Sequence, residues 1–141
     1  MSAISVEEAE QLLHSSVPPW MLALHLKVRE ITAESATLVM PFDEQLLRPG
    51  RIVAGQALMA LADTAMVLAL CSALGAFRPV ATVDMTTTFM RPATNTAIVA
   101  EATVLRLGRT LGFCQVRMLM DTMERPLVAH GVGSYSIPPA S

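Results

Sequence analysis

Aromatic and charged residues are scarce in this chain of 141 residues. Aromatic side chains make up 4% of it and charged ones 16%, with ten Lys and Arg against twelve Asp and Glu. Proteins that bind nucleic acid need a basic surface for the phosphates and, for single strands, aromatic rings on which bases stack. The sequence offers neither feature, so we expect no nucleic-acid partner.

Cysteine is also scarce, and the two that occur, Cys71 and Cys114, fall in a predicted helix and a predicted strand. Neither belongs to a CxxC motif or has a histidine neighbour of the kind that a metal site needs. The three histidines, His14, His25 and His130, show neither ligand spacing nor the pattern of a catalytic triad. We therefore expect two buried, reduced thiols and no metal site.

The first residues of the chain are acidic and polar, whereas a secretory signal would begin with a basic patch and an apolar run. Together with reduced thiols, this predicts a cytoplasmic protein. The length predicts one domain over residues 1–141, with an N-terminal helix and lead-in over residues 1–19. Ser5 and Glu8 have the spacing of a capping box at the start of that helix.

Apolar residues are abundant, at 52% of the chain with a mean hydropathy of +0.48. They concentrate in a predicted helix from Ala54 to Leu74, which contains one charged residue, Asp63, and which Gly75 would end as a left-handed cap. A helix that is apolar all round is buried in protein or spans a membrane. Because a central Asp63 opposes insertion into lipid, we expect burial in protein, no membrane partner, and self-association that hides further apolar surface.

Strand-like segments flank this helix on both sides. Two are predicted before it, from Trp20 to Glu30 and from Ser35 to Pro41, and they form a hairpin. Four longer segments rich in Val, Thr and Ile follow, and consecutive strands of this length most simply form an antiparallel meander. Glycines inside the last two would let the sheet bend or another group approach the backbone closely. The four segments are PVATVDMTTTFMRP, TAIVAEATVLRLG, RTLGFCQVRMLMD and RPLVAHGVGSYSIP.

Four motifs follow one another in order: GRIVAGQALMALADTAM, TVDMTTTFMRPA, VLRLGRTLGF and LVAHGVGSYSI. As a set, over roughly residues 23–137, they resemble the hotdog-fold thioesterases of the phenylacetate-degradation (PaaI-like) type. The resemblance implies an α+β fold in which a curved antiparallel sheet wraps around the central helix, with subunits paired edge to edge into dimers and often tetramers. It also implies hydrolysis of acyl-coenzyme A thioesters, with coenzyme A as part of the substrate and no metal or redox cofactor.

By this resemblance, Asp63 would act as a general base on water or as a nucleophile, and the backbone N–H of Gly55 would polarise the thioester carbonyl. The first N–H groups of a helix suit that task because they lack intrahelical partners. A rise of about 1.5 Å per residue places Asp63 roughly 12 Å along the axis from Gly55. Either only one group is used, or Gly55 of one subunit faces Asp63 of its neighbour. We favour the composite site, which makes dimerisation a condition of activity.

Three polar residues near Asp63 have both a functional and a structural interpretation. Gln56 shares a helical stripe with Asp63 and either takes part in catalysis or bonds to backbone. Thr82 matches a hydroxyl that orients the attacking water in some relatives, although threonine is common in strands. Asp84 would lie on the same face as Thr82. Asp63 itself has a structural alternative, a buried carboxylate held by hydroxyls or by Gln56 without chemistry.

The arginines at the strand end and hairpin, Arg91, Arg106 and Arg109, lie near the coenzyme A entrance in the family. Guanidinium groups suit phosphates, although solvated turn arginines are the alternative. Methionines along the helix, with Leu58, would line an adaptable acyl pocket. The residues expected to bind substrate are Val53, Ala54, Met59, Met66, Arg91, Pro92 and Arg109.

The chain departs from the family at the start of the helix. Many relatives have His-Gly-Gly where this chain has Val53, Ala54 and Gly55, and Asn where it has Leu47. The missing His and Asn leave a reduced site, favour a more apolar acyl group and argue against the related hydratases. The alternative is a non-catalytic hotdog protein that binds acyl-CoA or another apolar ligand.

Overall fold

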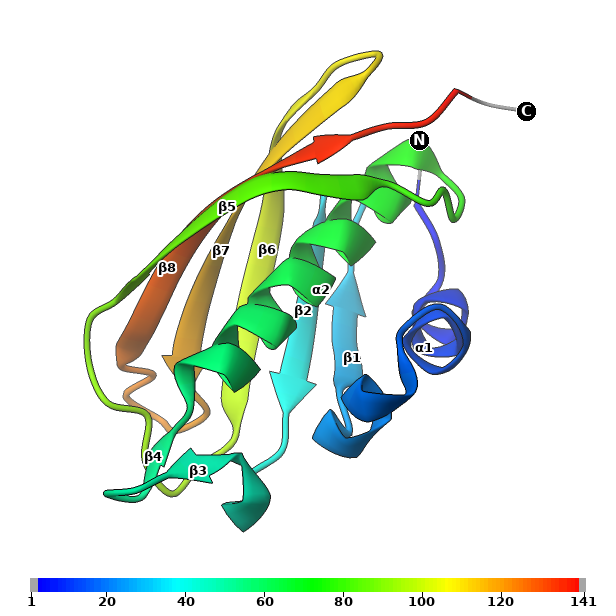
Figure 1. The fold of residues 1–141 in the computed structure, drawn as a ribbon. Coiled ribbons are helices and arrows are strands. Elements are labelled where there is room, and N and C mark those ends of the chain that lie inside the picture. Colours follow the sequence, from blue (N-terminus) through cyan, green and yellow to red (C-terminus); the bar gives the residue numbers. More distant parts are fainter. Residues whose placement is uncertain (1–2, 140–141) are drawn as a thin grey trace.

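An antiparallel sheet of six strands curves around one long helix in the computed structural model of the protein, which describes residues 3–139 (Figure 1). The strand order is β1-β2-β6-β7-β8-β5, and β3 and β4 form a separate two-stranded ladder. The expected α+β hotdog architecture is confirmed. The helices are α1 (Val6–Ser15) and α2 (Gly55–Leu74), the 3-10 turns are η1 (Pro19–Leu24) and η2 (Glu44–Leu46), and the strands are β1 (Lys27–Ile31), β2 (Ser35–Met40), β3 (Leu47–Arg48), β4 (Ile52–Val53), β5 (Ala81–Phe89), β6 (Ile98–Leu107), β7 (Leu111–Met120) and β8 (Leu127–Ser136).

Helix α2 lies across the concave face of the sheet (Figure 1). It ends as predicted, because Gly75 adopts a left-handed conformation with φ of 82° and its N–H bonds to the Cys71 and Ser72 carbonyls. By length and hydropathy α2 could cross a membrane, but 56% of its most apolar window is buried inside the protein. The helix therefore forms the core of the fold, with the sheet as its covering.

The prediction for the N-terminal region is right in its first part and wrong in its second. The Ser5 hydroxyl accepts from the Glu8 amide at 3.0 Å, and the Glu8 carboxylate accepts from the Ser5 amide at 2.9 Å, which is the predicted capping box. The predicted strand from Trp20 to Glu30 is wrong in its first half, which is η1. Pro19 at the first position of η1 has a φ suited to a helical turn and no N–H to leave unsatisfied.

The predicted meander of the last four strands is wrong at one position. Strands β6, β7 and β8 are successive hairpin neighbours, but β5 pairs with β8 and not with β6. Because β6 is paired with β2 on one side and β7 on the other, it has no edge left for β5, which pairs with the free side of β8. Strand β5 is consequently an edge strand, and most of its residues are exposed.

A bulge interrupts the pairing of β5 with β8. Thr82 lies opposite Tyr135 and Asp84 lies opposite Ser134, so Val83 is the extra residue. Cross-strand partners point to the same side of a sheet, and a bulge shifts the alternation that follows it. Asp84 therefore lies on the face opposite Thr82, and the expectation that the two share a face is wrong.

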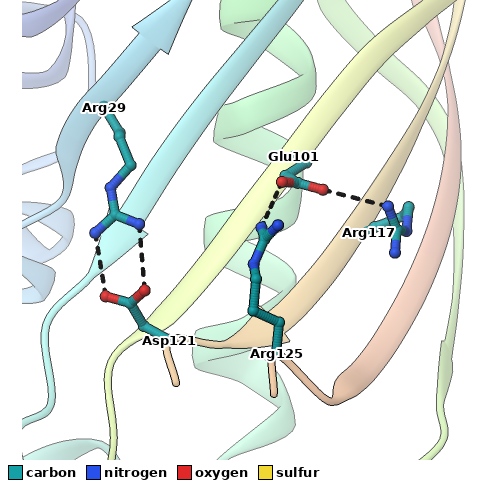
Figure 2. A network of polar contacts seen from close by, with 5 residues as sticks. All are labelled: Arg29, Glu101, Arg117, Asp121 and Arg125. Atoms are coloured by element: carbon teal, nitrogen blue, oxygen red, sulfur yellow. Dashed lines mark hydrogen bonds and ion pairs between the residues drawn. The ribbon is translucent and has the colours of Figure 1, made fainter. Parts of the chain in front are cut away.

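Ion pairs occupy the convex face of the sheet, on the side away from α2 (Figure 2). Arg29 forms a bidentate pair with Asp121, with N–O distances of 3.2 and 3.1 Å. Glu101 lies between Arg117 and Arg125 and bonds to both. Arg29 lowers the pKa of the Asp121 carboxyl through the hydrogen bonds and the charge of its guanidinium.

Both cysteines are buried and free, as predicted. Burial raises the pKa of the Cys114 thiol to about 12 and also raises that of Cys71. These thiols are therefore protonated and unreactive at neutral pH. Within residues 3–139, no three His, Cys, Asp or Glu residues gather into a group able to hold a metal ion.

Candidate active site at the central helix

Asp63 is held by two hydroxyl groups on one of its carboxylate oxygens. Its Oδ1 accepts a hydrogen bond from Thr82 Oγ1 at 3.0 Å and another from Tyr135 Oη at 2.8 Å. Its Oδ2 has no partner among the described residues, and none of the described cations forms an ion pair with it. The side chain is partly buried. A fixed, negatively charged carboxylate with one free oxygen can accept a proton or attack an electrophile.

Tyr135 is the residue that the sequence interpretation missed. It is the only tyrosine of the chain and its exposed fraction is 0%. Burial and the negative charge of Asp63 raise its pKa, so the phenol stays protonated and acts as the donor. A buried tyrosine needs a partner for its hydroxyl, and alternation along β8 turns Tyr135 inward. The alternation along β8 could have predicted from the sequence that the Tyr135 hydroxyl reaches a polar group on α2, but not which group.

A cavity of about 320 Å³ opens beside Asp63 and Thr82. Its walls come from α1, from the segment that follows α1, from the outer side of α2 and from the residues between α2 and β5. They are mostly apolar, and they include Leu12, Val17, Met21, Val67 and Phe77. The Asp63 carboxylate therefore borders a cavity that suits an apolar group.

The first turn of α2 lies in a different cavity, of about 400 Å³. Gly55 is the first residue of the helix, and Ala54 before it provides no side-chain cap. The first two amides of α2, those of Gly55 and Gln56, have no acceptor among residues 3–139 and are free to donate. The two cavities have no lining residue in common. One chain thus keeps its carboxylate and its helix N-terminus in separate places.

The predicted helical stripe changes from exposed to buried along α2. Gln56 and Met59 are exposed, whereas Met66 and Leu70 are fully buried against the sheet. Gln56 makes no hydrogen bond with Asp63. Leu58 lines the cavity at Gly55, and the walls of the cavity at Asp63 do not include any of the three apolar residues expected to hold the acyl group, Leu58, Met59 and Met66.

The arginines that the resemblance places near the coenzyme A entrance lie at two ends of the molecule. Arg91 and Pro92 line the cavity at Gly55, together with Arg48. Arg109 lies in the hairpin between β6 and β7, which extends beyond the opposite end of the sheet from β3 and β4 (Figure 1). Arg106 lines another cavity near that hairpin. Among the described residues, none of these four arginines forms an ion pair, so each could bind an anion.

The two positions at which the chain departs from the family are neighbours. Leu47 and Val53 lie directly opposite each other in the β3–β4 ladder, and Val53 is 4% exposed. The Ala54 N–H bonds to the Leu46 carbonyl and the Val53 N–H to the Ala93 carbonyl. An apolar cross-strand pair and backbone hydrogen bonds therefore hold the start of α2 in place here.

Comparison with known proteins agrees with this fold. The helix enclosed by a curved antiparallel sheet is the hotdog fold, and residues 51–126 match the family model described as the thioesterase superfamily. A protein of Halobacterium salinarum, provisionally named an esterase, is 32% identical over an alignment that covers 97% of both chains. The chain belongs to the thioesterase superfamily. The family and this relative support thioester hydrolysis as its general activity.

Solved structures with lower identity show the same fold. A thioesterase of Haemophilus influenzae superposes with a TM-score of 0.85 at 22% identity, covering 98% of this chain and 95% of the other. The PaaI protein from the phenylacetic acid degradation operon of E. coli superposes with a TM-score of 0.81 at 22% identity, covering 96% and 97%.

Proposed function

We propose that the protein hydrolyses acyl-coenzyme A thioesters to a free acid and coenzyme A. One observation carries the proposal: the Asp63 carboxylate has a free oxygen and no cationic partner, and it stands beside an apolar cavity. A carboxylate that served only the fold would gain from an ion pair or from full hydrogen bonding. The family supports the thioester as the bond that is broken.

In the proposed reaction, Asp63 removes a proton from water while the water oxygen attacks the thioester carbonyl carbon. The negative charge that develops on the carbonyl oxygen is stabilised by the Gly55 amide, with the Gln56 amide beside it. Collapse of the tetrahedral intermediate breaks the carbon–sulfur bond, and coenzyme A leaves as the thiolate, which takes up the proton held by Asp63 and so restores the carboxylate. Thr82 holds Asp63 in place and lies close enough to orient the water. In the nucleophilic alternative, Asp63 attacks directly and water then hydrolyses the acyl-enzyme anhydride.

Strand β5 supplies the geometric reason for a site shared between subunits. Thr82, near its beginning, contacts Asp63, and Phe89, at its end, lies next to Gly55, since a Cβ on Gly55 would be 3.4 Å from the Phe89 ring. Two copies of an edge strand pair antiparallel around a two-fold axis. An axis near the middle of β5 would set Thr82 opposite Phe89 of the partner subunit. Asp63 would then face Gly55 of the partner subunit, and the exposed β5 edge would be covered.

The two cavities would divide the substrate between them. The apolar cavity beside Asp63 suits the acyl group, so we assign the acyl group to this cavity and not to the methionines of α2. The cavity at Gly55 would receive the coenzyme A arm, with Val53 and Pro92 in its wall and Arg91 placed for a phosphate. Ala54, the residue before Gly55, is not part of that wall. Arg109 of the other subunit remains a second candidate for phosphate binding.

The test is the substitution Asp63→Asn, which keeps the shape and the two donated hydrogen bonds while removing the charge. We expect kcat to fall by about 10²- to 10⁴-fold in a thiol-release assay over aliphatic and aryl acyl-CoAs. Circular dichroism and gel filtration check that the variant keeps its fold and oligomeric state. Turnover equal to that of the wild-type protein would refute the proposal. A wild-type protein that binds coenzyme A esters and releases no thiol would be a binding module instead.

A further inference from the structure

The geometry points to Tyr135 as a positioning residue for Asp63, with Gly133 providing the space in which its ring lies. This inference rests on the proposed thioesterase function and adds to it a residue that acts through Asp63 and does not touch the substrate. Tyr135 and Thr82 are cross-strand partners on β8 and β5, and both donate to Oδ1 of Asp63. Two donors on one oxygen fix the carboxylate and leave Oδ2 as the reactive atom.

Gly133 is needed here for space and not for backbone conformation. It is not one of the glycines with positive φ, which are Gly50 and Gly75. A Cβ on Gly133 would lie 3.0 Å from Cε1 and 3.2 Å from Oη of Tyr135, and 3.1 Å from the Met66 methyl group. The phenol ring therefore lies back along β8 over Gly133, underneath α2. Any side chain at that position would push the ring, and the hydroxyl with it, away from Asp63.

The contact orients a charge without neutralising it. Asp63 on α2 and Cys114 on β7 are the titratable groups that face the Tyr135 hydroxyl. The Cys114 thiol is neutral, since burial raises its pKa to about 12. The phenol is neutral too, because burial and the charge of Asp63 raise its pKa. Neither the phenol nor the thiol therefore brings a positive charge to Asp63, whereas an arginine in place of Tyr135 would have formed an ion pair with it.

The test begins with Tyr135→Phe, which keeps the ring and removes the donor. We expect kcat to fall about ten- to hundredfold, with KM within about twofold, because a buried hydrogen bond to a charged group is lost at a residue that does not touch substrate. We also expect the acid limb of the kcat profile to move to higher pH, since losing a donor to the charged carboxylate favours protonation. A purely structural role would lower stability and leave both the acid limb and kcat of the folded protein unchanged.

A matched pair of glycine substitutions separates positioning from crowding. Gly133→Ala should reproduce the fall in kcat and add little to it in the Tyr135→Phe background. Gly131→Ala is the control, because a Cβ there would lie 3.2 Å from Thr87 and Val116 and does not meet Tyr135. It should lower the unfolding temperature and leave kcat unchanged. A Tyr135→Phe variant with the kcat and acid limb of the wild-type protein would overturn the inference and leave the function intact, whereas absence of thiol release from the wild-type protein would overturn both.

Discussion

The two faces of the sheet treat their carboxylates in opposite ways. On the convex face, Asp121 is exposed and Glu101 is partly buried, and both are paired with arginines (Figure 2). On the concave face, Asp63 is partly buried and receives two neutral hydroxyl groups. Exposed ion pairs contribute only about 0.2–1 kcal/mol each. This contrast supports the proposed role of Asp63 in the reaction, whereas the convex carboxylates contribute modestly to stability.

After the loss of Asp63 itself, the largest effect should come from removing the Gly55 amide, which we expect to act on the substrate held by Asp63 of the partner subunit. Gly55→Pro deletes the first helical N–H, and proline is tolerated there because Ala54 already has the extended conformation that must precede it. We expect kcat to fall about 10²- to 10³-fold. Gly55→Ala keeps the N–H and should retain most activity. If both variants keep wild-type kcat, the amide has no part in the reaction.

Mixing two inactive proteins tests whether the site is shared. In a heterodimer of Asp63→Asn and Gly55→Pro, one site carries both substitutions and the other carries neither. Random exchange of subunits should therefore restore about one quarter of wild-type activity, because half of the dimers are mixed and each has one intact site. No recovery, under conditions where mixed dimers are shown to form, would mean that each site lies within one chain.

A smaller effect is expected from removing the other hydroxyl on Asp63. Thr82→Val deletes a donor in the wall of the cavity beside Asp63, where water can replace it, whereas no water can replace the buried Tyr135 hydroxyl. We expect kcat to fall about three- to tenfold, less than in Tyr135→Phe. Steady-state kinetics of the two variants side by side decide the order. A loss from Thr82→Val larger than that from Tyr135→Phe would assign Thr82 a direct role toward water.

The smallest effect should come from the convex face. Asp121→Asn removes the pair with Arg29, and we expect a loss of at most about 1 kcal/mol in unfolding free energy and unchanged kcat. The pKa of Asp121 is lowered in the folded state, so its contribution is present above the unfolded pKa of about 4 and is lost as pH falls through the folded pKa. Denaturant titrations at pH 7 and pH 3 should therefore differ less in the variant. A large fall in kcat would contradict the division between the two faces.

The sequence predicts features whose causes are local and misses those that depend on distant pairing. Helix α2 and its cap at Gly75 follow from a continuous apolar run and a single glycine. The position of β5 depends on which strand edges remain free once β6 has two partners, and no local pattern encodes that. The candidate site divides in the same way. Asp63 stands out as the one charge in its helix, whereas its contact with Tyr135 joins residues 72 positions apart.

The topology also sets an order of folding. Ala81, the first residue of β5, pairs with Ser136 of β8, so β5 leaves the ribosome well before the strand that it needs. Pairings between residues far apart in sequence form late because a long loop must close first. Strand β5 therefore joins the sheet after the hairpins of β6, β7 and β8, and only then do Thr82 and Tyr135 meet beneath α2. In a nascent chain that lacks β8, neither Thr82 nor Tyr135 is in place to donate to Asp63. The proposed chemistry therefore begins only when the sheet is complete.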